Sequence, residues 1–165
     1  MRRPRPARPG PGQESVWDYP RPPALEETHE LVEVELGGVV VARTTRSWRV
    51  LETSHPPSYY IPKTDITSGL LRQVAGSSFC EWKGTAVYYD VEVDGVVLSR
   101  VGWSYPDPSS AFQSLRDHVA FYAAPFDRCS VDGETVRPQP GAFYGGWITD
   151  KLAGPFKGIP GSRGW

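Results

Sequence analysis

Residues 79–105 read FCEWKGTAVYYDVEVDGVVLSRVGWSY and contain the clearest hairpin pattern of the chain. Phe79–Val93 and Val96–Tyr105 are rich in β-branched and aromatic residues, which favour strands. Between them stands Asp94-Gly95, a pair typical of two-residue hairpin turns. The pattern therefore predicts two long antiparallel strands and a chain that is mainly β.

The turn also predicts how the two strands pair. A two-residue turn places Tyr88 opposite Val101 and Ala86 opposite Trp103, with side chains alternating between the two faces. Large rings then face residues with small side chains, and Tyr105 shares this face. Two interpretations are open: tight packing of large against small residues in the core, or a cleft walled by the rings.

A second dense motif lies near the end of the chain. Residues 143–147 read FYGGW and again crowd aromatic rings against glycine. Glycine leaves volume that a neighbouring ring fills only in part, and it lets the backbone come close to other groups. This segment is therefore expected to complete the wall of a cleft.

The rest of the chain favours short strands joined by turns. Residues 32–36 alternate apolar and acidic side chains, as a half-buried strand does, and Gly37-Gly38 follows as a tight turn. Residues 66–74 are interpreted as one or two helical turns. One short helix is predicted near residues 108–116, with Asp107 as its N-cap. The expected fold class is mainly β with this one helix.

Length and composition predict one domain preceded by a short tail. The chain has 165 residues, of which 39% are hydrophobic, enough to form a buried core. Residues 1–14 form an Arg/Pro-rich tail that is expected to be disordered, and residues 15–165 form the domain. Trp17 and Tyr19, set between prolines, are expected to pin the start of the domain onto its body.

Charge and hydropathy exclude several classes of partner. There is no apolar run as long as a membrane span and no signal peptide, so a soluble, cytoplasmic protein without a membrane partner is expected. The first twelve residues carry four arginines and no acid, which leaves the remainder net acidic. An acidic body is a poor surface for phosphates, so no nucleic-acid partner is expected. The basic tail is interpreted as a solvated extension, with a nucleic-acid-binding arm as the alternative. The sequence does not set the oligomeric state.

Standard metal and phosphate sites are not expected. Zinc sites use clustered Cys and His ligands, whereas here the two cysteines, Cys80 and Cys129, and the three histidines, His29, His55 and His118, are scattered. Neither a phosphate-binding loop nor a dinucleotide-binding glycine motif is present. The sequence predicts no metal and no cofactor. A disulfide between the two cysteines is disfavoured without a secretion signal.

Four residues are candidates for catalysis. Cys80 is a candidate nucleophile, with Lys83 as the cation that would activate its thiol. Residues three apart on a regular strand point to opposite faces, however, so a buried structural cysteine is the alternative. Glu52 and Asp65 lie beside aromatic residues and are candidates for a general acid or base, or for holding Mg²⁺. Their alternatives are a solvated strand end for Glu52 and a turn cap for Asp65.

Six motifs, in order along the chain, resemble one known family. They are WDYPRPP at 17–23, YYIP at 59–62, CEWKG at 80–84, WSY at 103–105, VAFY at 119–122 and FYGGW at 143–147. Together they resemble the domain of unknown function 427 family, over residues 15–165. Some classifications give this family a nucleotidyltransferase-type name, which carries no demonstrated mechanism.

The resemblance implies a β-tent fold, in which two antiparallel sheets meet at an angle. This architecture is similar to methionine sulfoxide reductase B and to the thalidomide-binding domain of cereblon, which place ligands on a sheet face near aromatic side chains. The zinc that such relatives often hold needs Cys-x-x-Cys pairs, which this chain lacks. By the same analogy the ligand-binding residues here would be Tyr60, Trp82, Lys83, Trp103, Tyr105, Tyr144 and Trp147.

The function expected is the binding of a small flat or polar ligand in an aromatic-lined cleft. One alternative is an enzyme, either nucleotidyltransferase-like or dependent on Cys80. Another is a peptide-binding interaction module that uses the same aromatic face. Likeness of fold does not decide among them. A reactive thiol or a carboxylate pair able to hold Mg²⁺ would favour the enzyme.

Overall fold

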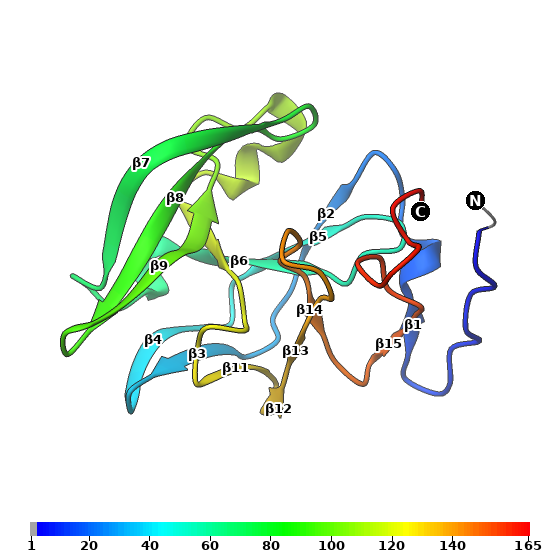
Figure 1. Cartoon of the computed structure of the whole chain (residues 1–165), viewed down its shortest axis with the longest axis horizontal. Coiled ribbons are helices and arrows are strands. Elements are labelled where there is room, and N and C mark those ends of the chain that lie inside the picture. The colour runs from blue at the N-terminus through cyan, green and yellow to red at the C-terminus, as the bar shows by residue number, and fades with distance from the viewer. Residues whose placement is uncertain (1–2) are drawn as a thin grey trace.

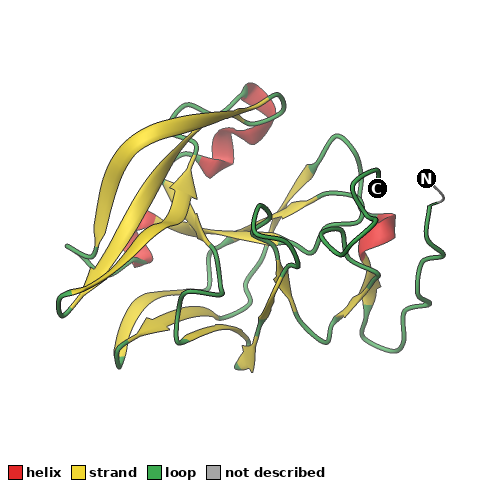
Figure 2. Cartoon of the chain, viewed as in Figure 1, coloured by secondary structure: helices red, strands yellow, loops and turns green. Residues whose placement is uncertain are grey.

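The structure is a computed structural model that describes residues 3–165. Figure 2 shows that it is mainly β. The strands are β1 (Glu14–Ser15), β2 (Ala24–Glu27), β3 (Val32–Leu36), β4 (Val39–Thr44), β5 (Trp48–Leu51), β6 (Ser58–Pro62), β7 (Leu71–Cys80), β8 (Gly84–Val93), β9 (Val96–Ser104), β10 (His118–Phe121), β11 (Arg128–Val131), β12 (Glu134–Thr135), β13 (Arg137–Pro138), β14 (Trp147–Ile148) and β15 (Leu152–Ala153). The 3-10 helices are η1 (Val16–Asp18), η2 (Lys63–Asp65) and η3 (Ser110–Leu115). Within residues 3–165, no helix has the length and apolar character needed to cross a membrane.

Two principal antiparallel sheets organise these strands. The large sheet has seven strands in the order β2-β5-β6-β10-β9-β8-β7, and the small sheet has four in the order β12-β11-β3-β4. Figure 1 shows β7, β8 and β9 inclined to β3 and β4 below them. Two short ladders complete the fold, β13–β14 antiparallel and β1–β15 parallel. The expected mainly β fold with antiparallel sheets is confirmed.

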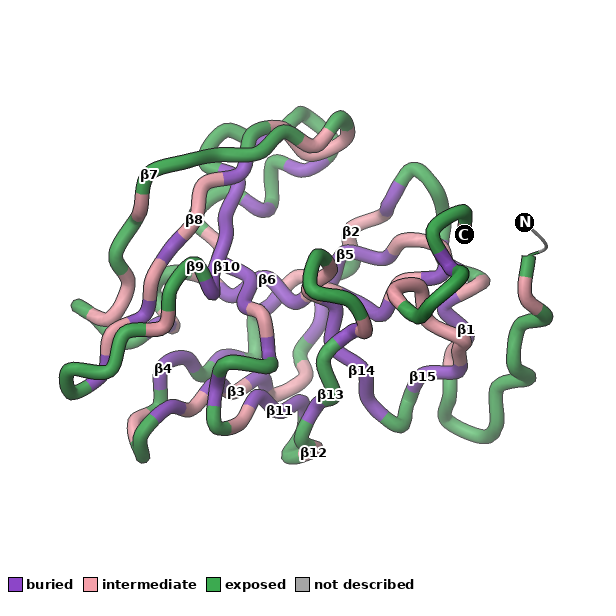
Figure 3. The backbone as a smooth tube through the Cα atoms, in the orientation of Figure 1, coloured by how far each residue is buried: buried purple, intermediate pink, exposed green. Residues whose placement is uncertain are grey.

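The large sheet carries apolar side chains on both faces. Because side chains alternate along β6, Tyr59 and Ile61 belong to the core shared with the small sheet, while Tyr60 points to the opposite face. The first face packs against Val32 and Val34 of β3. Figure 3 shows β6 and β10 mostly buried and the edge strand β7 mostly exposed. The candidate site lies on the Tyr60 face.

The hairpin β8–β9 departs from the predicted register. Between the turn and the pair Val91–Leu98, the strands pair as predicted. Beyond that pair, β9 contains two more residues than β8 before the pairing resumes. As a result Tyr88 lies opposite Trp103, and the predicted partner Val101 is wrong. The predicted pair of Ala86 with Trp103 is wrong for the same reason.

A β-bulge causes this shift. Arg100 lies in the extra segment with a left-handed φ of 50°, and its backbone N–H donates to Asp90 Oδ1 over 2.8 Å. Because the shift is by an even number of residues, Trp103 and Tyr105 keep the face that alternation predicts. Val101 instead joins the core on the other face.

A second hairpin, β7–β8, replaces part of the predicted long strand. Phe79 and Cys80 end β7, residues 81–83 form the turn, and Gly84 opens β8 opposite Cys80. The helical turns predicted for residues 66–74 are wrong, because β7 already begins at Leu71. An exposed edge strand lacks the apolar alternation that marks a half-buried one, which explains the error.

The predicted short helix is present as η3, a 3-10 helix that buries Phe112 and Leu115. Its N-cap is Ser109, without a side-chain capping bond, so the prediction of Asp107 as N-cap is wrong. The helix closes the end of the sheet nearest the β7–β8 turn, because Ser109 donates its backbone N–H to Lys83 O over 3.1 Å.

The first elements of the chain are docked against the last ones, and Figure 1 shows β1 beside β15. Trp17 donates its Nε1–H to Pro155 O over 2.9 Å, and its ring lies 5.5 Å from that of Trp165. Tyr19 is buried against Val16 and its neighbours. Both aromatics that were expected to pin this segment therefore do so.

The tail predicted for residues 1–14 makes contacts of its own. Ala7 donates its backbone N–H to Gly154 O over 2.8 Å, and Glu14 already belongs to β1. The disorder of this tail and the domain boundary at residue 15 stay predictions. Residues 1–2 lie outside the described part of the chain.

Candidate functional site

A cleft of about 650 Å³ opens on the Tyr60 face of the large sheet. Strands β5, β7, β8 and β9 supply its floor and one side, and the segment 139–145, which we call the facing segment, supplies another. Its volume lies within the range of small-molecule sites. The aromatic lining consists of Phe79, Trp82, Tyr88, Trp103, Tyr105, Tyr122, Phe143 and Tyr144.

Trp103 is the centre of the aromatic wall. Its ring lies 4.7 Å from that of Tyr122, and its Nε1–H donates to the Tyr60 hydroxyl over 3.1 Å. Gly145 approaches from the facing segment so closely that a Cβ at this position would overlap the indole. Glycine at 145 is therefore what lets the facing segment lie against Trp103.

Burial keeps the phenols beside Trp103 protonated. Desolvation raises the pKa of Tyr60, although the indole N–H that it accepts lowers this pKa in part. Desolvation and the neighbouring Tyr60 raise the pKa of Tyr105. Both hydroxyls are therefore neutral at pH 7. Tyr105 lines the cleft, whereas Tyr60 lies beneath Trp103 and supports it.

A chain of polar side chains runs from the facing segment into the cleft. Gln139 is buried and donates from Nε2 to Lys157 O over 2.9 Å and to His55 Nδ1 over 3.0 Å, while its Oε1 accepts the Gly146 N–H over 3.1 Å. Since Nδ1 of His55 is an acceptor, the ring proton belongs on Nε2. That Nε2 lies 3.3 Å from Glu52 Oε2.

Glu52 is held as a carboxylate at the end of this chain. Burial would raise its pKa, but the hydrogen bond from His55 and the charges of Arg21 and Lys83 outweigh burial and bring the pKa below the ordinary value of 4.5. Arg21 and His55 both contact Oε2, each at 3.3 Å. Among the described residues, Oε1 accepts no hydrogen bond, which leaves an acceptor available to the cleft.

Cys80 ends β7 and Lys83 is the last residue of the β7–β8 turn, so the two do not lie on one regular strand, and strand alternation does not set their relative directions. Cys80 lines the cleft as a free, half-buried thiol. Lys83 lies at the edge of the cleft, with Nζ 5.7 Å from the Tyr105 ring centroid. Cys129, by contrast, lies in the main core, where burial raises its pKa to about 12.

Glu52 and Asp65 are not brought together. Asp65 lies in η2, outside the cleft, and accepts from Thr44 Oγ1 over 2.6 Å and from Arg46 Nη2 over 3.0 Å. The hydrogen bond from Thr44 lowers the pKa of Asp65 by more than burial raises it, so this pKa lies below its ordinary value. In the described part of the chain, no group of three or more His, Cys, Asp and Glu side chains is placed to hold a metal ion.

Trp147 is the member of the predicted ligand set that the structure does not bring to the cleft. It is 1% exposed and lies in the core, where its Nε1–H donates to Phe121 O over 2.9 Å and its ring lies 5.4 Å from that of Tyr59. The remaining members lie in or beside the cleft: Trp82, Trp103, Tyr105 and Tyr144 line it, Lys83 stands at its edge, and Tyr60 lies beneath it.

Sequence reasoning missed the polar chain and the rim. His55 and Gln139 are 84 residues apart in sequence, so only the fold brings them together. The one local signal is that His55 follows Glu52 by three residues. Phe79, which is 76% exposed, was also missed as a rim residue of the cleft, whereas Phe143, 82% exposed, belongs to the segment that was expected to complete its wall.

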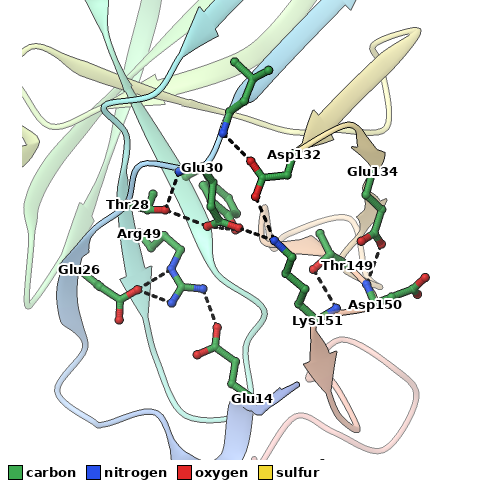
Figure 4. Close-up of polar contacts among 12 residues, drawn as sticks. Glu14, Glu26, Thr28, Glu30, Arg49, Asp132, Glu134, Thr149, Asp150 and Lys151 are labelled. Carbon is green, nitrogen blue, oxygen red and sulfur yellow. Dashed lines mark hydrogen bonds and ion pairs between the residues drawn. The ribbon is translucent and has the colours of Figure 1, made fainter. Parts of the chain in front are cut away.

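A second polar cluster lies on the face of β5 opposite the cleft (Figure 4). Arg49 is buried between the carboxylates of Glu26 and Glu14, the latter at 2.6 Å. Nearby, Lys151 lies 3.0 Å from Asp132. These carboxylates are already paired with cations from distant parts of the chain, so the cluster joins β1, β2 and β5 and is structural.

Comparison with known proteins gives one family. A family model described as "Domain of unknown function (DUF427)" matches residues 24–132. The matched residues run from β2 to the end of β11 and include Glu52, His55 and Trp103, while the facing segment lies beyond them. None of the curated proteins matches the chain.

Proposed function

The chain belongs to the DUF427 family, and we propose that it binds a small flat or polar ligand in the aromatic-lined cleft. The observation that carries this proposal is the combination of aromatic walls with the ionised carboxylate of Glu52. Trp103, Tyr105 and Tyr144 offer ring faces for stacking, and Glu52 offers a carboxylate oxygen. A planar molecule with an N–H or O–H donor on its edge would stack on these rings and donate a hydrogen bond to Glu52.

The state of Glu52 favours binding over general base catalysis. An efficient catalytic base has a pKa near the working pH. Interactions with His55 and Arg21 instead bring the pKa of Glu52 below 4.5. Such a carboxylate is a strong hydrogen-bond acceptor and a weak base at pH 7, which suits recognition.

Intrinsic tryptophan fluorescence tests the proposal, because Trp82 and Trp103 line the cleft. The purified chain is titrated with nucleosides, nucleotides and cyclic amides. We expect at least one compound to change the emission saturably with a dissociation constant below about 1 mM. Saturable binding by none of them at that concentration would contradict the proposal.

Three variants connect the signal to the cleft. Trp82→Ala removes one ring and should weaken binding by about tenfold or more, the effect of losing one stacking partner. Glu52→Gln should weaken the binding of compounds that donate an N–H to this position. Glu27→Gln is the matched control, since it removes an exposed carboxylate of β2. Binding that survives Trp82→Ala and Glu52→Gln unchanged lies elsewhere.

A thiol-dependent reaction is a second candidate function, because Cys80 lines the same cleft. Titration of the native protein with a thiol reagent distinguishes it, with Cys80→Ser to identify the reacting group. Cys129 is 2% exposed and serves as the unreactive reference within the same molecule. If native Cys80 reacts no faster than Cys129, the thiol-dependent enzyme is excluded.

The cytoplasmic location and the lack of nucleic-acid and membrane partners belong to the same proposal. The lack of nucleic-acid and anionic-membrane partners rests on the acidic balance of residues 13–165. Cell fractionation and retention on heparin and on anionic vesicles test them. Retention at physiological salt would contradict the proposal.

A further inference from the structure

A smaller hollow of about 350 Å³ adjoins the cleft. The two share Tyr88, Tyr122 and Phe143 in their linings, so the hollow lies directly beside the cleft. Among residues 3–165, Arg100 is the one charged residue that lines this hollow. The charge of Arg100 lowers the pKa of Tyr122 in part, against the desolvation that raises it, which agrees with this proximity.

The guanidinium of the exposed residue Arg100 is held by two contacts and keeps free donors. It lies over the ring of Tyr88, 4.3 Å from the centroid, and Nη1 donates to Ala75 O over 2.9 Å. In the described part of the chain, no carboxylate forms an ion pair with it, in contrast to Arg49 with its two glutamates. Nε and Nη2 are therefore available to an anion.

Two bulges build this position. The bulge of β9 contains Arg100, and a second register shift, in β7 between Val74 and Ser77, presents the Ala75 carbonyl. Gly76 at the second bulge has a φ of 102°, and a Cβ there would lie 3.0 Å from Arg100 Nη1. The guanidinium thus spans β8 from one bulge to the other. An unbroken hairpin would instead place Arg100 opposite Tyr89, whose side chain lies on the other face of the sheet from that of Tyr88.

We propose that Arg100 is an anion subsite at the mouth of the cleft, so that the ligand carries an acidic group, phosphate or carboxylate, attached to its ring. This inference rests on the proposed function, since the ring must occupy the cleft. Among the described residues that line the two hollows, the charged ones in the cleft are Glu52 and Glu81, and the one in the neighbouring hollow is Arg100. Glu52 is already paired with Arg21, and Lys83 stands at the edge of the cleft, whereas Arg100 has no carboxylate partner among the described residues, so its attraction orients the acidic group toward Tyr88.

Matched pairs of probes test the subsite. Adenosine is compared with adenosine 5′-monophosphate, uridine with its 5′-monophosphate, and uracil with orotate, by tryptophan fluorescence of the full chain. The first two pairs report on phosphate and the third on carboxylate. We expect the acidic member of at least one pair to bind about tenfold more tightly, as a charged hydrogen bond allows. This gain should shrink when salt rises from about 0.05 M to about 0.5 M.

Substitutions assign the gain to one residue. Arg100→Gln should abolish the gain, so that the acidic and the uncharged member of a pair bind with equal affinity. Arg72→Gln is the control, because it removes the same charge from β7, where Arg72 pairs with Glu92. Arg100→Lys, which keeps the charge, should retain part of the gain, and thermal melts show that each variant is folded.

The outcomes separate the two proposals. If the members of every pair bind equally well, or if Arg100→Gln keeps the full gain, the anion subsite is wrong and ring binding stands. A gain lost equally in Arg72→Gln also refutes it, since net charge alone would then explain the effect. If neither member of any pair binds, the proposed function itself fails, and the subsite falls with it. The salt dependence is measured on the unsubstituted chain, so it tests the subsite even where a variant unfolds.

Discussion

The indole N–H of Trp103 donates to the hydroxyl of Tyr60, and both residues are buried. The two residues come from β9 and β6, which β10 separates in the large sheet. The bond therefore ties two non-adjacent strands together on the face that carries the cleft. It also fixes the plane of the ring at the centre of the aromatic wall.

Loss of this bond should destabilise the fold. We predict that Tyr60→Phe lowers the free energy of unfolding by about 1–3 kcal/mol, because the buried N–H of Trp103 then has no acceptor. Urea denaturation at pH 7 measures the change. Tyr144→Phe is the control, since Tyr144 lies partly exposed at the cleft, and its change should stay within about 0.5 kcal/mol. Equal losses in the two variants would show that the Trp103 bond contributes nothing of its own.

Position 145 should tolerate only glycine. We predict that Gly145→Ala displaces the facing segment and lowers the free energy of unfolding by about 1–3 kcal/mol, because the added methyl overlaps the Trp103 ring. Tryptophan emission should shift toward that of a more solvated indole. Gly10→Ala is the control, because a Cβ at Gly10 meets only the end of the Gln13 side chain, at 3.4 Å. A Gly145→Ala protein with the stability and emission of the parent would contradict the close approach.

The contribution of Glu52 to stability should depend on pH. Its folded pKa lies below 4.5, so the folded protein binds this proton less tightly than the unfolded chain does. The stabilisation is therefore complete above the unfolded pKa and is lost as the pH falls through the lower folded value. The difference in unfolding free energy between the parent and Glu52→Gln should be present at about pH 7 and shrink by about pH 3. Glu27→Gln should show no such trend, and a Glu52→Gln difference that persists undiminished in acid would refute the prediction.

Two truncations should separate the tail from the docked aromatics. Deletion of residues 1–12 should change the melting temperature little, because this segment contributes few apolar contacts. Deletion of residues 1–23 removes Trp17 and Tyr19, and burial of one large aromatic contributes about 2–3 kcal/mol. Thermal melts of both proteins measure the difference. Equal melting temperatures would mean that the two aromatics do not stabilise the domain.

Local patterns predicted much of the β structure and the aromatic wall. The alternation of Ala86, Trp103 and Tyr105 placed these residues on one face, and that face carries the cleft. The register failed at Arg100, because nothing in the sequence marks a residue that bulges with a left-handed φ. The chain of polar side chains that ends at Glu52 was not predicted, for a different reason. Its hydrogen bonds join segments that are far apart in the sequence, and no periodicity encodes such a contact.

The facing segment determines how short a fragment of the chain can be and still contain the whole cleft. The family match ends at residue 132, whereas Gln139 and Gly145 stand beyond it and close one side of the cleft. A fragment cut to the matched residues would keep Trp103 but expose its indole, and would leave His55 Nδ1 without its donor. The smallest piece that retains a complete cleft therefore extends past the matched region. Two chains that are alike over the matched region alone are free to differ in which molecules they select.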